Sequence, residues 1–223
     1  MYFYHPTNNI SQIDEEYTDH FFSMRVKIGD IILTTDLDGL KREIKITEID
    51  KKSKTILFKI LESSFENRKI EKNILFQAIT DKIYLDKLVE IAPHANVDII
   101  YLFYSERSPT HNFGIDRLER IIYRSCEQAQ KLYKPDIEIV DQISLAKLLD
   151  LYRPIVLEIS HNTEALMNPE NNYTQSVLVG PEGGWSTTEK NLYKKKGLLF
   201  ESLGSIVYPA WLAGYTWFIK NTK

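Results

Sequence analysis

The sequence contains a single cysteine, Cys126, and no apolar run long enough to cross a bilayer. One cysteine cannot form a disulfide within the chain, which favours a reducing compartment. The longest apolar runs, such as residues 97–104, have the length of a strand. The first residues show no basic stretch followed by an apolar one, so we expect no secretory signal. These absences predict a cytoplasmic protein that does not enter a membrane.

An excess of positive charge is also missing. The chain has 28 basic and 31 acidic residues, which gives a formal net charge of −3. Many nucleic-acid-binding proteins are basic, so this balance argues mildly against such a partner without excluding it, because the distribution of charge matters more than its sum. His94 and His161 lack spaced partners of the kind that bind a metal, so we expect no metal site.

Short strands separated by polar turns dominate the first part of the chain. Strand patterns occur at residues 28–35, 42–49 and 55–61. Several short strands with little helix are typical of a small barrel. Residues 65–72 are polar and charged and have the character of a linker. We therefore predict a first domain over residues 1–66 and a second over residues 73–223.

Strands alternate with helices in the second part. We expect strands at 74–79, 97–104, 137–140, 154–159, 177–179 and 198–202, and helices at 83–92, 115–133, 144–151, 187–196 and 210–220. Strands without a polar face indicate a sheet that is covered on both sides. This pattern predicts an α/β domain with a mainly parallel sheet.

A glycine-rich turn follows the strand expected at 177–179 and reads Gly180-Pro181-Glu182-Gly183-Gly184-Trp185-Ser186. Ser186 and Glu189 have the spacing of a capping box, which predicts a helix from Thr187. Open α/β sheets bind ligands at such turns, where glycine lets the backbone approach a ligand closely. A tight turn without a ligand is an equally open interpretation. The glycine spacing fits neither a phosphate-binding P-loop nor a dinucleotide fingerprint.

With Val179 before it and Glu189 after it, this turn resembles the signature of the ribosomal RNA small-subunit methyltransferase E family of the SPOUT superfamily. Four shorter motifs match the family in the same order. They are residues 20–30, which follow a His-x-x-x-Val-Leu-Arg-x-x-x-Gly-Asp pattern one residue shorter, Glu106-Arg107-Ser108, Glu127-Gln128, and Leu203-Gly204. The resemblance covers essentially the whole chain.

The resemblance implies an enzyme that transfers a methyl group from S-adenosylmethionine to N3 of a uridine in 16S ribosomal RNA of the small subunit. It implies an α/β trefoil-knot domain, preceded by a small PUA-like β-barrel that binds RNA. It also implies a homodimer in which one subunit's barrel lies near the other's cofactor. The cofactor would be held by loops at 157–161, 179–184 and 203–208, with contacts from Leu157, Glu158, Val179, Gly180, Pro181, Glu182, Gly183, Gly184, Leu203, Gly204, Val207 and Tyr208.

Chemistry at uracil N3 requires that its proton leave, so the site needs a proton acceptor or groups that stabilise the resulting anion. Glu182 is a candidate acceptor, although orienting the turn or the cofactor would explain it equally well. Arg107 follows a strand end and is expected to contact the substrate. Arg25, Lys27 and Arg117 are further candidates for RNA contact, while Arg117 could instead pair with acidic residues of its own helix.

The chain departs from the family pattern in its last loop. Ile206 and Pro209 stand where the family usually has arginines, and Trp211 stands where it has a glutamate. These replacements lie around the expected active site. They leave open a second hypothesis, that of a catalytically weakened or inactive protein that binds RNA or assists ribosome assembly.

Overall fold

Two compact units make up the chain in the computed structural model, which describes residues 2–5, 11–13, 15–111, 113–159 and 174–221. The first unit comprises Met1–Arg68 together with Tyr123–Lys134, and the second comprises Lys69–Ile122 and Pro135–Lys223. The sequence had placed residues 123–134 in the second domain. They belong to the first unit because the Tyr123 ring stacks on Tyr4 and the Glu127 carboxylate accepts a hydrogen bond from the backbone N–H of Tyr4 at 2.7 Å.

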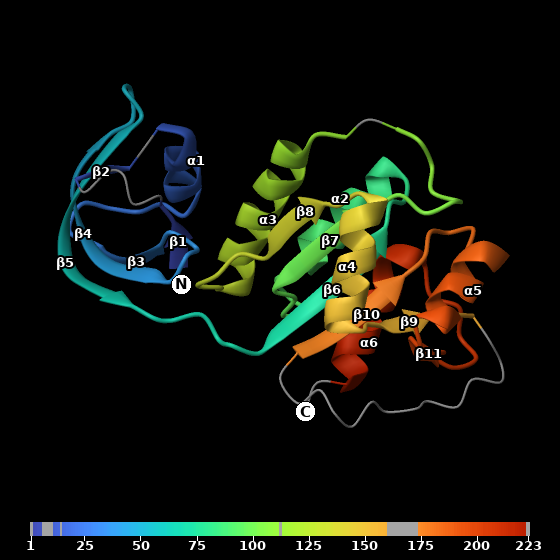
Figure 1. Ribbon diagram of the computed structural model, residues 1–223. Helices are drawn as coiled ribbons and strands as arrows, with labels where there is room; N and C mark the ends of the chain where they lie inside the picture. The colour runs from blue at the N-terminus through green and yellow to red at the C-terminus, as the bar shows by residue number, and fades with distance from the viewer. Residues whose placement is uncertain (1, 6–10, 14, 112, 160–173, 222–223) are drawn as a thin grey trace. The chain divides into compact units, whose positions relative to one another are not determined.

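The first unit is built on a curved, five-stranded sheet (Figure 1). Its elements are β1 (Tyr2–Tyr4), β2 (Gln12–Ile13), α1 (Glu15–Ser23), β3 (Ile31–Thr35), β4 (Leu40–Asp50) and β5 (Thr55–Phe65). The strand order is β1-β3-β4-β5-β2, in which β1 and β3 are parallel and the other pairs are antiparallel. Among the described residues β1 and β2 do not pair with each other, so the sheet is an open half-barrel. Helix α1 was not predicted.

The core of this unit explains the helix. Phe21 of α1 is fully buried and belongs to an apolar cluster with Ile44 and Phe58 of the sheet. Register shifts between Glu43 and Ile44 and between Ile46 and Glu48 mark irregularities in the β4–β5 pair. Bulges of this kind bend a strand pair, which lets the sheet curve around an aromatic side chain.

The second unit contains a six-stranded, wholly parallel sheet with the order β11-β9-β10-β6-β7-β8. Its strands are β6 (Lys72–Ala78), β7 (Ile99–Phe103), β8 (Asp136–Ile139), β9 (Ile155–Leu157), β10 (Thr174–Val179) and β11 (Phe200–Glu201). Its helices are α2 (Lys82–Ile91), α4 (Gln142–Tyr152), α5 (Thr187–Lys195) and α6 (Ala210–Asn221), and α3 (Ile115–Ala129) runs from this unit into the first. The predicted α/β architecture is confirmed for this unit.

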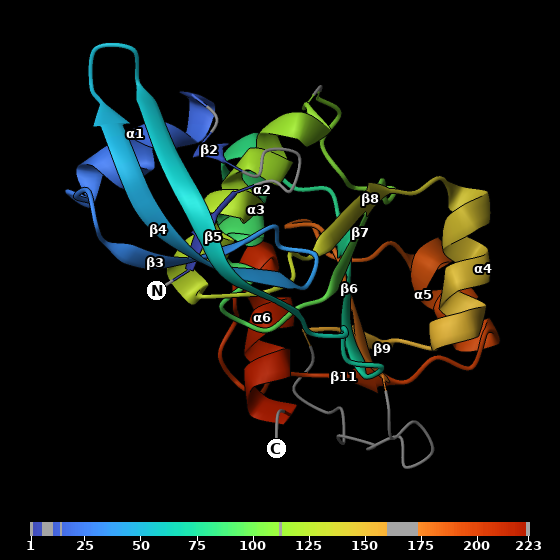
Figure 2. The same ribbon diagram turned by 90° about the vertical axis from the view of Figure 1, so that its left-hand side faces the viewer.

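Helices cover both faces of this sheet (Figure 2). On one face, Leu145 of α4 and Tyr193 of α5 join the buried cluster around Phe76. On the other face, α6 packs so closely that a Cβ atom added to Gly214 would lie 2.5 Å from a methyl carbon of Leu75. Burial on both faces explains why these strands lack a polar side. In the described part of the chain, no helix has the length and apolarity that crossing a membrane would require.

Two predicted helix ends can be compared with the structure. The capping box is confirmed, because Ser186 Oγ accepts a hydrogen bond from the N–H of Glu189 at 3.1 Å and Glu189 Oε2 accepts one from the N–H of Ser186 at 2.8 Å. Helix α3 was expected to reach Tyr133 but ends at Ala129. The next residue, Gln130, has a φ of 56°, a left-handed conformation that terminates a helix. Cys126 of α3 is fully buried.

Candidate functional site

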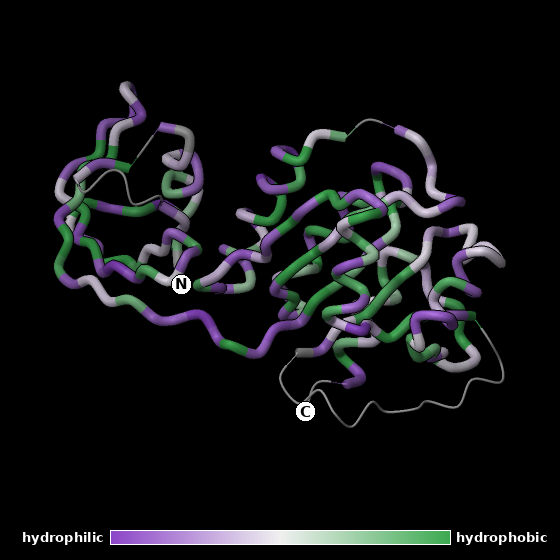
Figure 3. The backbone as a smooth tube through the Cα atoms, viewed as in Figure 1, coloured by the Kyte–Doolittle hydropathy of each residue, from purple (hydrophilic) through white to green (hydrophobic). Residues whose placement is uncertain are grey.

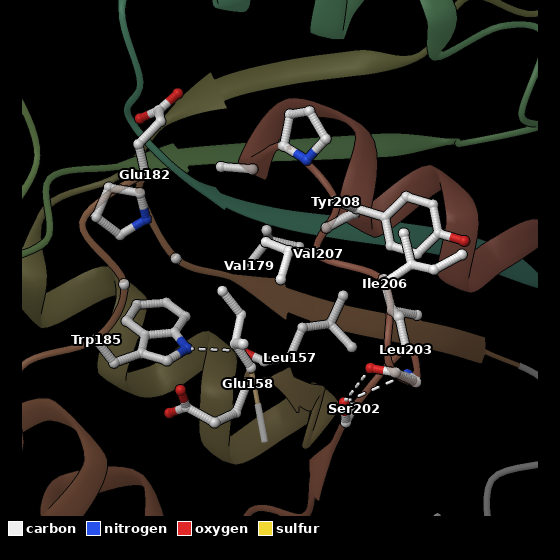
Figure 4. A pocket seen from close by; sticks show the side chains of 18 residues that line it. Leu157, Glu158, Val179, Glu182, Trp185, Ser202, Leu203, Ile206, Val207 and Tyr208 are labelled. Carbon is white, nitrogen blue, oxygen red and sulfur yellow. Dashed lines mark hydrogen bonds between the residues drawn. The ribbon is translucent and has the colours of Figure 1, made fainter. Parts of the chain in front are cut away.

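A cavity of about 390 Å³ opens where β9, β10 and β11 end (Figure 4). Three segments line it: 157–159 at the end of β9, 179–185 at the end of β10, and 202–213, which leads from β11 into the first turn of α6. The lining residues are Leu157, Glu158, Ile159, Val179, Gly180, Pro181, Glu182, Gly184, Trp185, Ser202, Leu203, Gly204, Ile206, Val207, Tyr208, Pro209, Ala210 and Ala213. Apolar side chains and glycine predominate, and the volume lies within the usual range for small-molecule sites.

The glycines of the turn after β10, at positions 180, 183 and 184, differ in what a side chain there would meet. Gly184 has a φ of 65°, a conformation that side-chain-bearing residues rarely adopt. Gly180 has no such constraint, but an added Cβ would lie 3.1 Å from the ring of Trp185. Gly183 meets neither condition: an added Cβ would make ordinary contacts of 3.5 Å with Arg107, and Gly183 does not line the cavity.

Trp185 joins two of the three segments. Its indole Nε1 donates a hydrogen bond to the backbone carbonyl of Leu157 at 2.9 Å, as the dashed line in Figure 4 shows. The side chain is 3% exposed and packs against the rings of Phe103 and Tyr193. The turn after β10 is therefore fixed both to the core and to the segment after β9.

The motif after β7 lies against the same turn. Arg107 is exposed, and its Nη1 donates a hydrogen bond to the carbonyl of Gly183 at 2.7 Å. The backbone N–H of Glu106 donates to Glu189 Oε1 at 3.1 Å. Glu189, which caps α5 through its other oxygen, therefore links the two segments. Since a guanidinium has five N–H donors, Arg107 keeps donors for a further partner.

Carboxylates lie at two places around the cavity. Burial raises the pKa of Glu182; a hydrogen bond with its own backbone partly offsets this, and the charge of Asp81 adds to the increase. Glu158 Oε2 lies 2.7 Å from Lys190 Nζ, within ion-pair distance but without hydrogen-bond geometry. The negative charge of Glu158 is thus partly balanced, whereas Glu182 faces a second negative charge.

The cavity brings together eleven of the twelve residues that the resemblance assigns to the cofactor, all except Gly183. Ser160 and His161 of the first predicted loop lie outside the described residues. Sequence reasoning placed Pro209 near the active site but did not assign it to the cofactor, and it missed Trp185, Ser202, Ala210 and Ala213 as lining residues. Trp185 stood within the recognised motif, but no sequence signal showed that its indole reaches back to Leu157. Pro209, Ala210 and Ala213 line the cavity only because α6 packs beside β10.

The predicted RNA-contacting residues are divided between the two units. Arg25 and Lys27 are exposed between α1 and β3 in the first unit, and Arg25 has a φ of 56°. Arg107 belongs to the cavity region of the second unit. Arg117 forms an ion pair with Asp86 of α2, not with the acidic residues of its own helix. The described residues contain no group of three or more histidine, cysteine, aspartate or glutamate side chains that could hold a metal ion.

Known proteins resemble this chain in sequence and in fold. Residues 66–207 match the RNA methyltransferase domain family. The ribosomal RNA small subunit methyltransferase E of Helicobacter pylori is 25% identical over 189 residues, which cover 82% of this chain and 80% of that protein. The structure of a probable rRNA-methyltransferase from Porphyromonas gingivalis has a TM-score of 0.84 at 20% identity, covering 98% of this chain and 95% of that one.

The structure of the ribosomal RNA small subunit methyltransferase E from Neisseria gonorrhoeae, bound to S-adenosylmethionine, has a TM-score of 0.81 at 19% identity. It covers 98% of this chain and 95% of that one. At these identities the two structures show the shared fold. The family match extends over well more than half of the chain, from before β6 to the last loop of the cavity. This chain therefore belongs to the RNA methyltransferase domain family, as its glycine turn and the four shorter motifs predicted.

Proposed function

We propose that this protein is an S-adenosylmethionine-dependent methyltransferase that modifies N3 of a uridine in 16S ribosomal RNA. The observation that carries the proposal is the cavity at the ends of β9, β10 and β11, formed by the three segments that the sequence resemblance assigns to the cofactor. The bound cofactor of the Neisseria gonorrhoeae protein and the name of the Helicobacter pylori relative support it. An enzyme with this substrate would act in the cytoplasm, where ribosomes are assembled.

The cavity suits such a cofactor. Leu157, Val179 and Leu203 offer an apolar surface for an adenine ring, and the glycines let backbone donors and acceptors approach it. The carboxylates of Glu158 and Glu182 complement the positive charge of a sulfonium. When bound there, S-adenosylmethionine would supply an electrophilic methyl group on that sulfonium.

The chain's own groups would prepare the uracil. Glu182 stands at the cavity with a raised pKa, so its carboxylate is a better proton acceptor than an ordinary glutamate and can take the N3 proton. Arg107 is held against Gly183 and keeps free donors, which can stabilise the negative charge left on the uracil. These two roles require that both residues face the target base when RNA is bound.

RNA binding, the knot and the dimer would involve parts of the molecule beyond the cavity. The half-barrel, with Arg25 and Lys27 exposed, would bind RNA as the PUA-like domain of the family is expected to do. Arg117 would contribute to RNA binding from the second unit, although its ion pair with Asp86 must then be shared or broken. The C-terminal segment would pass through the knot that the resemblance implies, and two copies would form a homodimer.

Two measurements test the proposal. Isothermal titration should show that the full chain binds S-adenosylmethionine. Small ribosomal subunits from a strain that lacks the gene should accept a labelled methyl group, and nuclease digestion with mass spectrometry should identify the product as N3-methyluridine. A protein that binds the cofactor but methylates a different atom would refute the uridine-N3 assignment alone. Absence of cofactor binding would refute the proposal as a whole.

A second candidate is an inactive RNA-binding or assembly protein on the same scaffold. The observation that favours it is the apolar rim of the cavity, where Ile206 and Pro209 replace the arginines of the family pattern. It predicts binding to small-subunit ribosomal RNA without methyl transfer, so the labelling experiment separates the two candidates.

A further inference from the structure

The segment 202–209 forms one wall of the cavity but has little apolar support. Ile206 and Val207 are 65% and 63% exposed, and Gly204 and Ser205 are exposed as well. Gly204 has a φ of 107°, which is open to glycine and strained for other residues. Inside the segment, Ser202 Oγ accepts a hydrogen bond from the N–H of Gly204 and donates one to its carbonyl, both at 3.3 Å. Such a segment needs support from outside to keep one conformation.

Helix α6 supplies that support from two side chains one turn apart. Trp217 Nε1 donates a hydrogen bond to Glu201 Oε2 at 2.9 Å, just before the segment begins. Lys220 Nζ donates a hydrogen bond to the carbonyl of Leu203 at 2.7 Å. The same ammonium lies 6.0 Å from the centre of the Tyr208 ring, near the far end of the segment. Residues three apart share one face of a helix, so α6 holds the segment at both ends.

We infer that Lys220 is a positioning residue for the cofactor. Its ammonium joins Leu203 to Tyr208, and both of these residues line the cavity. The ammonium thereby contacts both ends of the intervening residues 204–207, of which Gly204, Ile206 and Val207 also line the cavity. The inference rests on the proposed function, because it assumes that this cavity takes S-adenosylmethionine. Lys220 lies outside every recognised motif, so no sequence pattern pointed to this role.

An exposed lysine in the last turn of a helix also has a purely structural role, because its charge interacts favourably with the helix dipole. Lys195 has the same place in α5 and is likewise exposed, but it does not line the cavity or contact its wall. Lys220 differs from it by the bond to Leu203 and the contact with Tyr208. A comparison of the two lysines therefore separates positioning of the cavity wall from stabilisation of a helix end.

The experiment measures S-adenosylmethionine binding by titration calorimetry, and thermal unfolding without ligand, for the full-length wild type and the variants Lys220→Met, Lys220→Arg and Lys195→Met. Lys220→Met keeps the length of the side chain and removes its charge and its donor. We expect its dissociation constant to rise roughly tenfold, the effect of losing one charge-assisted hydrogen bond. Lys220→Arg should retain wild-type affinity because a guanidinium can still donate to the carbonyl. Lys195→Met should retain it as well.

Kinetics provide the readout that a structural role would not change. Lys220→Met should raise the KM for S-adenosylmethionine and leave kcat at saturating cofactor close to wild type. Three results would each overturn the inference. The first is an unchanged affinity for S-adenosylmethionine in Lys220→Met, and the second is an equal loss of affinity in Lys220→Met and Lys220→Arg. The third is a loss of affinity in both Lys220→Met and Lys195→Met that accompanies an equal fall in their unfolding temperatures. If the wild type itself fails to bind, the proposed function falls first, so the two failures are distinguishable.

Discussion

Two walls of the same cavity are built in opposite ways. The turn at 179–185 is anchored in the core through Trp185, is followed by a capped helix, and receives a hydrogen bond from Arg107. The segment at 202–209 is largely exposed and is held by polar contacts from α6. A buried, interlocked turn has a single arrangement, whereas an exposed segment depends on a few bonds at its ends. We therefore expect substitutions that disturb the core contacts of the first wall to affect folding and binding together, and substitutions in the exposed second wall to leave folding nearly unchanged.

The largest effect is expected from Gly180→Val. The added Cβ would lie 3.1 Å from the Trp185 ring and the methyl groups of valine would crowd it further, so the ring must shift although it is packed in the core and bonded to Leu157. Overpacking of this kind costs about 1–3 kcal/mol of unfolding free energy, and we expect cofactor binding to be lost. Urea unfolding and titration with S-adenosylmethionine measure both effects.

Gly183→Ala is the matched control in the same turn. Its Cβ would make ordinary contacts with Arg107 and would not enter the cavity. Stability and affinity should stay near wild type. Equal losses in the two glycine variants would show that the turn as a whole, and not its contact with Trp185, determines binding.

The pH dependence of methyl transfer should report on Glu182. Its pKa is raised, and a proton acceptor must be ionised, so the rate should fall as the pH decreases through a value above the ordinary glutamate pKa. Asp81→Asn removes a negative charge that favours the protonated form, so the acid limb should move to lower pH. Glu182→Gln should remove most of the rate.

The Asp81→Asn variant tests whether the acid limb belongs to Glu182. An acid limb that stays in place in Asp81→Asn, in a protein with wild-type cofactor affinity, would show that another group titrates. A Glu182→Gln variant with the full rate would assign Glu182 to orientation of the turn and not to proton transfer.

The smallest effect on folding is expected from Ile206→Arg in the second wall. Ile206 is mostly exposed, so the unfolding free energy should change by less than about 0.5 kcal/mol. The new arginine restores a residue type that the family pattern has at this position. If the native enzyme is weakened by the replacement, Ile206→Arg should increase the rate of methyl transfer. A large loss of stability would contradict the view that this wall is independent of the core.

Much of the second unit was predictable because its pattern is local. Strands that are apolar on both faces indicated the parallel sheet, and the spacing of Ser186 and Glu189 located the start of α5. The end of α3 was not predictable, since apolar Leu132 continues the helical spacing past the residue where the backbone turns left-handed. Helix α1 was missed for a related reason: Phe21 is buried by a sheet that curves around it, which short-range spacing does not show.

In the candidate site, too, features that depend on neighbouring residues were predictable and those that depend on packing were not. The glycine turn was recognisable from residue order alone, because a strand, glycines and a capping box follow each other directly in the chain. The sequence did not show why each glycine is needed. The contacts that a side chain at Gly180 would make with Trp185, and one at Gly183 with Arg107, depend on how the strands and helices pack. The same holds for Arg117: its ion pair with Asp86 of α2 joins two helices, and residue spacing within its own helix did not show that partner.

The amino-acid sequence by itself determined the family of this protein, the α/β character of its second unit and the turn at its cavity, because each depends on residues that are near one another in the chain. Only the tertiary structure decided that α6 returns beside β10 and that its Trp217 and Lys220 bond to Glu201 and Leu203. It also decided that residues 123–134 pack with the first unit. These contacts join residues that lie far apart in the sequence or depend on how whole elements pack. They form only when the complete chain is folded.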